Sequence, residues 1–173
     1  METKIIRIRQ LELSDTSQLA ALANNKNIWD NLRDYFPHPY TQNDAKFFIE
    51  LSGKQKPTHN FAVEFNGELC GVVGLVAQKD VYKKTAEIGY WIGEGFWGKG
   101  IASEAVRLLT AYGFSVLGFV RIFSGVFEYN IASMKVLEKS GFKKEAIFKD
   151  AIYKNGKIYN EHRYYLLNRE HAV

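Results

Sequence analysis

The residues best suited to chemistry form a glycine-rich turn near the middle of the chain, from Phe96 to Ser103 (FWGKGIAS). A strand-like run, Ala86 to Gly93, precedes this turn, and a helix-like run, Ser103 to Val116, follows it. The first turn of a helix presents backbone N–H groups without a partner inside the helix, and the helix dipole adds partial positive charge there. Glycines at 98 and 100 let the backbone approach an anion closely because glycine has no Cβ. The turn is therefore suited to bind a pyrophosphate.

Two better-known phosphate loops do not fit this turn. The P-loop needs a second glycine followed by Lys and Ser/Thr at a fixed spacing, which the sequence lacks. The dinucleotide fingerprint needs glycine where Ser103 stands, and it belongs early in a βαβ repeat, whereas hairpin-like strands precede this turn. Taken alone, the turn could also be a plain connection between a strand and a helix.

Two blocks of sequence resemble the GNAT acetyltransferase superfamily, and within it the branch of the ribosomal-protein N-terminal acetyltransferases. The first block is AEIGYWIG followed by FWGKGIASEA, from Ala86 to Ala105. The second runs from Asn130 to Phe142 (NIAS, VLEK and SGF), and the start of the chain, with Phe36 to Tyr40, agrees more loosely. Trp97 stands where the superfamily usually has Gln or Arg, a feature of that branch. The resemblance spans about Lys4 to Leu167.

The resemblance implies an α+β (mixed α/β) fold in a single domain over residues 4–168. Its central sheet would be mostly antiparallel, with about seven strands flanked by about four helices. Two neighbouring strands, Ala86 to Gly93 and Val120 to Phe127, would splay apart to hold the cofactor.

Local signals predict several elements. Asn66-Gly67 and Asn155-Gly156 are hairpin turns. Ser14-Asp15 offers an N-cap for a first helix, and Thr41 with Asp44 a capping box for a second, whose apolar face we expect to be Phe47, Phe48 and Leu51. Asn130 caps a short helix that Gly141 can end.

Acetyl-coenzyme A is the cosubstrate that the resemblance implies, with no metal. Its diphosphate would lie on the amides of the turn and its pantetheine beside the preceding strand. Lys99 could add charge near the phosphates or be a solvated lysine. The cofactor-binding residues implied are Trp91, Ile92, Gly93, Trp97, Gly98, Lys99, Gly100, Ile101, Ala102, Ser103, Asn130 and Ser133.

Acetyl transfer to an amine needs the neutral amine, and an amine with a pKa of about 8 to 10 is largely protonated at neutral pH. Glu87 is the first candidate base, because alternation places it on one face of its strand with Gly89 and Trp91. It could equally be a solvent-facing residue paired with a lysine. Ser133 resembles the residue that protonates the departing thiolate. Weaker base candidates are Glu128 and Glu68, and the resemblance points to the Ile92 amide for the oxyanion.

Acceptor recognition is expected in variable segments: residues 31–40, residues 79–84 and the final hairpin. Candidate substrate residues are Arg33, Tyr40 and Tyr153. Asp34 and Glu161 could attract a cationic amine, whereas Arg33 and His38 could bind a carboxylate, and these alternatives stay open. By resemblance a peptide or protein N-terminus ranks first among acceptors, ahead of a polyamine, an amino acid or an aminoglycoside-like antibiotic. A non-catalytic acyl-CoA-binding module and a small nucleotide-binding transferase are the rival classes.

The overall composition bounds the remaining possibilities. The net charge is +4, from 23 basic and 19 acidic residues that form no basic stripe, so we expect no nucleic-acid partner. Cys70 is the single cysteine, which excludes an intrachain disulfide, and no His/Cys pair has zinc spacing. The N-terminus shows no apolar signal core, and no stretch approaches the roughly 18 apolar residues of a membrane span. We therefore expect a cytoplasmic protein without membrane contact, possibly a homodimer.

Overall fold

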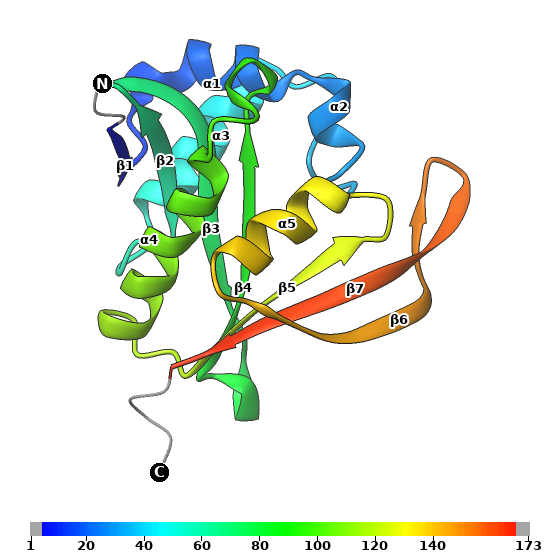
Figure 1. Cartoon of the computed structure of the whole chain (residues 1–173). Helices are drawn as coiled ribbons and strands as arrows, with labels where there is room; N and C mark the ends of the chain where they lie inside the picture. The colour runs from blue at the N-terminus through cyan, green and yellow to red at the C-terminus, as the bar shows by residue number, and fades with distance from the viewer. Residues whose placement is uncertain (1–4, 169–173) are drawn as a thin grey trace. The chain divides into compact units, whose positions relative to one another are not determined.

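The computed structural model describes residues 5–168, which form a seven-stranded sheet and five α-helices (Figure 1). The strand order is β1-β2-β3-β4-β5-β7-β6, and β4 pairs with β5 in parallel. The strands are β1 (Ile6–Arg9), β2 (Asn60–Phe65), β3 (Glu68–Ala77), β4 (Thr85–Ile92), β5 (Arg121–Phe127), β6 (Lys143–Lys154) and β7 (Lys157–Leu167). The helices are α1 (Thr16–Ala23), α2 (Lys26–Trp29), α3 (Gln42–Gly53), α4 (Ile101–Ser115) and α5 (Ile131–Lys139). The predicted mixed fold is confirmed.

About four helices were expected, and the short helix α2 is the one that was not predicted. Asn25 begins it by accepting hydrogen bonds from the amides of Asn27 and Ile28. One turn of helix leaves too few apolar positions for a periodic pattern, so hydrophobicity alone does not reveal it.

The residues group into two compact units. The first holds the chain up to Gly74 together with Tyr90–Ala105, and the second holds Leu75–Gly89 and the chain from Val106 on. The single domain over residues 4–168 stays a prediction.

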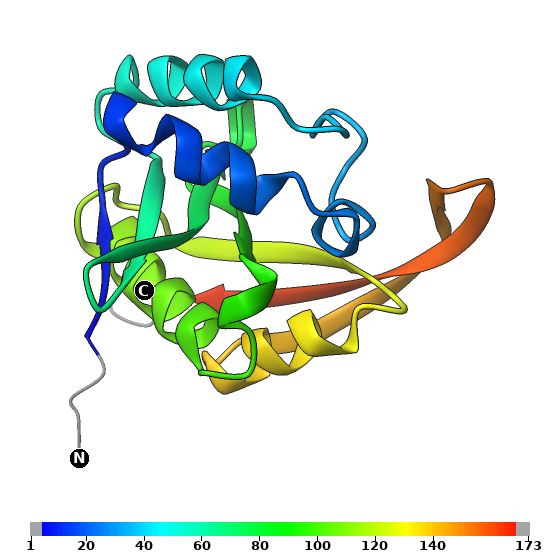
Figure 2. The same ribbon diagram turned by 90° about the horizontal axis from the view of Figure 1, so that it is seen from above.

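Helices α1 and α3 lie side by side in the first unit (Figure 2) and form its core with β2 and β3. The buried residues of α3 are Ala45, Ile49 and Ser52, which follow one another at steps of four and three residues. The predicted apolar face was right for Phe48, which packs partly buried against this core, and wrong for Phe47 and Leu51, which are 67% and 50% exposed. Helical residues three and four apart share a face, so the face that carries Ala45, Ile49 and Ser52 is the one turned toward this core.

An ion pair at the start of the first unit replaces the helix cap expected from Asp15. Asp15 is buried, and its two carboxylate oxygens accept from the guanidinium of Arg9 at 2.7 Å each. It also accepts from the amide of Glu12 at 2.8 Å, and Glu64 of β2 binds the Nε of Arg9 at 3.0 Å. The N-cap prediction was therefore wrong for α1: Asp15 instead ties β1 to the turn before that helix.

Replacing Asp15 by Asn is expected to lower the free energy of unfolding by about 2 kcal/mol, the scale of a hydrogen bond to a charged group. The Arg9 guanidinium lowers the pKa of Asp15 in the folded state. A lowered pKa stabilises the fold above the unfolded value of about 3.9, and this contribution is lost as pH falls through the folded pKa. Urea denaturation at pH 7 and pH 3 should show a smaller pH effect for Asp15→Asn than for wild type. Equal pH dependence would contradict this.

The second unit is organised around the long β6–β7 hairpin (Figure 1). Its turn at Asn155-Gly156 has φ of 52° and 75°, as the predicted hairpin requires. Tyr164 of β7 is buried, and its hydroxyl donates to Glu138 of α5 at 3.1 Å, so α5 covers the face of β7 that carries Tyr164. Burial, assisted by Glu138, raises the pKa of Tyr164 to about 12.

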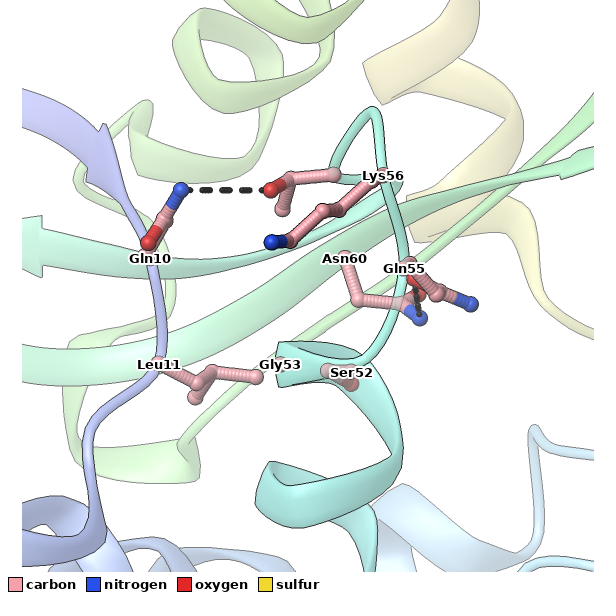
Figure 3. Close-up of a pocket in the computed structure, with 8 residues that line it drawn as sticks. Gln10, Leu11, Ser52, Gly53, Gln55, Lys56 and Asn60 are labelled. Atoms are coloured by element: carbon pink, nitrogen blue, oxygen red, sulfur yellow. Dashed lines mark hydrogen bonds between the residues drawn. The ribbon is translucent and has the colours of Figure 1, made fainter.

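A small polar cavity of about 120 Å³ opens in the first unit where the end of α3 meets the chain around Gln10 and Lys56 (Figure 3). A hydrogen bond joins Gln10 to Thr58 at this cavity, and the buried Ser52 hydroxyl at its wall has no hydrogen-bond partner within residues 5–168. None of the predicted site residues lines this cavity.

Candidate active site

The glycine-rich turn of the first unit has the backbone shape expected of an anion site. Gly98 and Gly100 have φ of 74° and 82°, a region in which residues with a Cβ are strained. A Cβ built on either glycine meets nothing within 4 Å, so the protein leaves space beside both. Helix α4 begins at Ile101, two residues earlier than predicted, and its first backbone bond runs from Glu104 N–H to the Gly100 carbonyl at 3.3 Å. The amides of Ile101 and Ala102 precede that bond, at the positive end of the helix dipole. This arrangement fits a diphosphate.

Two side chains of the turn, Trp97 and Lys99, stabilise its shape. The indole Nε1 of Trp97 donates to the Ile92 carbonyl at 2.6 Å, which joins the turn to the end of β4. The ammonium of Lys99 donates to the Gly95 carbonyl at 3.0 Å and lies 5.1 Å from the centroid of the Phe96 ring. In this conformation Lys99 closes the turn on itself, a role that neither sequence interpretation included.

The end of β4 packs tightly in the first unit. Gly93 donates its amide to the Cys70 carbonyl at 2.8 Å, and a Cβ on Gly93 would lie 2.7 Å from Leu22. Trp91 contacts Phe36 edge to face, with ring centroids 6.2 Å apart. The predicted acceptor segment, residues 31–40, therefore packs against the strand predicted to lie beside the pantetheine.

Cys70 of β3 is a core residue. Cys70 is fully buried and its thiol contacts the Val63 carbonyl at 3.3 Å. Burial, assisted by nearby carboxylates, raises the pKa of the thiol to about 12, so it is protonated at neutral pH and a poor nucleophile.

The parallel pairing of β4 with β5 in the second unit runs from Thr85 opposite Arg121 to Glu87 opposite Phe123. At the next position the Ser124 hydroxyl donates to the Ile88 carbonyl at 3.1 Å. A side chain thus satisfies a carbonyl just beyond the three pairs of the ladder. Sequence reasoning missed Ser124, and the only available signal was a polar residue within an apolar strand.

Asn130 and Ser133 lie together at the start of α5 in the second unit. The Asn130 side chain accepts from the Ser133 amide at 3.1 Å, which confirms the predicted N-cap. Gly141 has φ of 90° just past the end of this helix, as predicted. The cofactor and proton-donor roles of Asn130 and Ser133 stay predictions.

The carboxylates considered as bases have different surroundings. Glu87 lies on β4, half-buried between buried Ala86 and Ile88, so the predicted alternation is confirmed. Glu128 accepts from both the amide and the side-chain nitrogen of Asn160, at 2.9 and 2.8 Å. Both of its oxygens therefore hold β7 in place, which makes Glu128 the less suitable base. Glu68 is exposed and accepts from Gln18 at 3.2 Å.

Of the three candidate substrate residues, two belong to the first unit and one to the second. Tyr40 is buried in the core of the first unit, stacked on Phe36 at 4.8 Å, and burial raises its pKa to about 12. Arg33 is exposed in the same segment. Tyr153 is 71% exposed at the tip of the β6–β7 hairpin in the second unit.

Residues 5–168 contain neither a membrane-spanning helix nor a metal-binding cluster. No helix there combines the length and apolar character needed to cross a membrane. No cluster of three or more His, Cys, Asp or Glu side chains in the same residues is arranged to hold a metal ion.

Comparison with known proteins agrees with this geometry. Residues 6–143 match the family described as an acetyltransferase (GNAT) domain. The putative ribosomal N-acetyltransferase YdaF of Bacillus subtilis (strain 168) is 40% identical over 170 residues, which cover 95% of this chain and 92% of that protein. Spermidine N(1)-acetyltransferase of Escherichia coli (strain K12) is 30% identical over 174 residues, which cover 97% of this chain and 89% of that protein. Among solved structures, one similar to this chain is the crystal structure of spermidine N-acetyltransferase from Vibrio cholerae in complex with CoA and spermine. The two superimpose with a TM-score of 0.79 at 25% identity, and the match covers 94% of this chain and 95% of that chain.

The match to the family covers most of the chain, and the similarity to YdaF agrees with the branch predicted from Trp97 and its neighbours. The chain therefore belongs to the GNAT acetyltransferase family, whose enzymes transfer acetyl groups from acetyl-CoA.

Proposed function

We propose that the protein acetylates the N-terminal amine of a peptide or protein, with acetyl-CoA as the donor. The observation that carries the choice of acceptor is the 40% identity to a putative ribosomal N-acetyltransferase across nearly the whole of both chains. A small polyamine is the second candidate, supported by the 30% identity to spermidine N(1)-acetyltransferase.

The glycine-rich turn supports binding of the donor. The space beside Gly98 and Gly100, together with the N-terminal amides of α4, suits the diphosphate of acetyl-CoA. Trp97 and Lys99 keep the turn in this shape through their bonds to backbone carbonyls. Asn130 is proposed to contact the pantetheine in addition to capping α5.

Glu87 is the proposed base, directly or through a water molecule. The carboxylate takes a proton from the acceptor ammonium, the neutral amine then attacks the thioester carbonyl, and the C–S bond breaks to release CoA thiolate. Ser133 is the proposed donor of the proton that converts this thiolate into the thiol, and the second proton that the nitrogen loses as it becomes the amide restores the Ser133 hydroxyl. The backbone amide of Ile92 is the proposed donor to the oxyanion.

Release of CoA thiol across a panel of acceptors tests this function. The panel contains peptides with free N-termini, the same peptides with blocked N-termini, spermidine and amino-sugar antibiotics. We expect kcat/KM to be highest for free peptides and thiol release to vanish when the N-terminus is blocked. Preference for spermidine would favour the second candidate. Binding of acetyl-CoA with no thiol release from any acceptor would support a non-catalytic module instead.

A further inference from the structure

One face of the sheet in the second unit carries both Glu87 and an ion pair that sequence reasoning did not find. Residues directly opposite each other on neighbouring strands point to the same side of a sheet, as do residues two apart on one strand. The strand registers therefore define a shared side, here called the Glu161 face, with the members Glu87, Phe123, Gly125, Phe148, Glu161 and Arg163. Helix α5 covers the opposite face of β7, the one that carries Tyr164.

The carboxylate of Glu161 is held firmly on this face. Glu161 is only 8% exposed, and both the Nε and Nη2 of Arg163 donate to its Oε1, at 3.1 and 2.5 Å. The Arg163 guanidinium in turn lies between two rings, 4.8 Å from the centroid of Phe123 and 4.5 Å from that of Phe148. A guanidinium stacked in this way is fixed in orientation, so it fixes the carboxylate that it binds.

Gly125 provides the space that the Glu161 carboxylate occupies. A Cβ built on Gly125 would lie 2.6 Å from the Cδ of Glu161 and 2.7 Å from its Oε2. Such distances are not tolerated between non-bonded atoms, so any side chain at position 125 would displace the carboxylate. The backbone conformation does not require a glycine at position 125, because φ there is not positive. The requirement comes from the close approach of the Glu161 carboxylate.

The second carboxylate oxygen remains available to a ligand. Oε2 of Glu161 accepts no hydrogen bond from residues 5–168, since both donors of Arg163 go to Oε1. The buried side-chain atoms without a partner in that part of the chain belong to Ser52, Thr110 and His162, so Oε2 is reached from the surface. A mostly buried carboxylate oxygen without a donor is costly, and a cationic donor offsets that cost best.

The position of Glu161 relative to Glu87 suits an acceptor molecule. Glu87 is opposite Phe123, and Gly125, beneath the Glu161 carboxylate, is two residues or about 7 Å further along β5. Resting on the proposed amine acetylation, we propose that Oε2 of Glu161 accepts a hydrogen bond from the cationic ammonium of the acceptor. Glu161 thereby determines specificity for amines that are charged at neutral pH, and Arg163 and Gly125 are positioning residues.

Replacing Glu161 by Gln tests this role through the charge of the acceptor. For a peptide with a free N-terminus and for spermidine, both cationic at neutral pH, we expect KM to rise about tenfold, as for the loss of one charge-assisted hydrogen bond. For aniline, which is uncharged at neutral pH, KM should not change, nor should the KM for acetyl-CoA. Glu145→Gln is the matched control, because Glu145 also pairs with an arginine, Arg121, yet lies exposed. It should behave as wild type.

Gly125→Ala supplies a second test that keeps the charge. It should raise KM for the cationic acceptors, as is expected for Glu161→Gln. If Glu161→Gln fails to fold, Gly125→Ala alone tests the role of Glu161 in binding the acceptor. An equal KM change for aniline and the cationic acceptors in either variant, or no change for any of them, would overturn the role of Glu161. If wild type acetylates nothing, the proposed function fails. Calorimetry with spermidine and the free peptide in the presence of CoA then decides the role of Glu161 by whether Glu161→Gln binds them more weakly.

Discussion

The double variant Gly98→Ala/Gly100→Ala is expected to raise the Kd for CoA about 100-fold. An alanine in the left-handed region costs about 1 to 2 kcal/mol, and 1.4 kcal/mol corresponds to a factor of ten in affinity. The turn must either keep its shape at this cost or relax to another conformation that turns the α4 amides away from the phosphates. A relaxed turn loses affinity, and the added methyl groups fill the space that both glycines leave beside the backbone. Calorimetric titration with CoA measures the effect.

Gly67→Ala is the matched control for this prediction. Gly67 has φ of 86° in the β2–β3 turn of the same unit, and a Cβ there also meets nothing within 4 Å. The control therefore carries a similar backbone penalty without any expected contact to CoA. Thermal unfolding should show comparable destabilisation per substituted glycine in both proteins, while only the turn variant loses affinity. A Kd for CoA within about threefold of the wild-type value corresponds to a loss of less than about 0.7 kcal/mol of binding free energy. Such a result would show that these glycines do not bind the diphosphate.

These glycines also show what the sequence could predict. Asn66-Gly67 and Asn155-Gly156 determine their hairpins locally, because both residues of each pair adopt positive φ, and the structure has a hairpin at each of these turns. The cap at Asn130 was predictable for the same reason, since side chain and backbone partner are three residues apart. The turn from Phe96 to Ser103 belongs to this local class, so its link to a phosphate ligand could be inferred before the structure.

Non-local features could not be inferred in this way. The face that α3 buries depends on its packing in a core shared with α1, β2 and β3, segments that are far apart in the sequence. The same holds for the Glu161 face. Gly125 and Glu161 are 36 positions apart, and only the register of β5 with β7 brings a carboxylate over a glycine. Side-chain roles that depend on strand register therefore needed the structure, whereas roles that depend on a turn or a cap did not.

Replacing Glu87 by Gln is expected to lower kcat by a factor of about 10² to 10⁴, the range for loss of a general base. Gln has nearly the size of Glu, so the half-buried position between Ala86 and Ile88 should remain packed and the pairing with Phe123 intact. The Kd for CoA should be unchanged, because the glycine-rich turn is untouched. Stopped-flow measurement of CoA thiol release separates the chemical step from product release.

The pH dependence distinguishes a base from a residue that only supports the strand. If Glu87 accepts the proton, the part of the pH profile of kcat/KM that depends on this carboxylate should disappear in Glu87→Gln, so that only the dependence on the ionisation of the amine remains. If the substitution only disturbed the packing of the strand, the rate would fall at every pH and the shape of the pH profile would be unchanged. Glu145→Gln again serves as the control, with an expected rate and profile equal to wild type. A fall of less than about tenfold with the shape of the pH profile retained would exclude Glu87 as the base, since even modest general-base catalysis contributes more. The Glu161 test would be unaffected by that result, because it measures how the acceptor binds and not how its proton leaves.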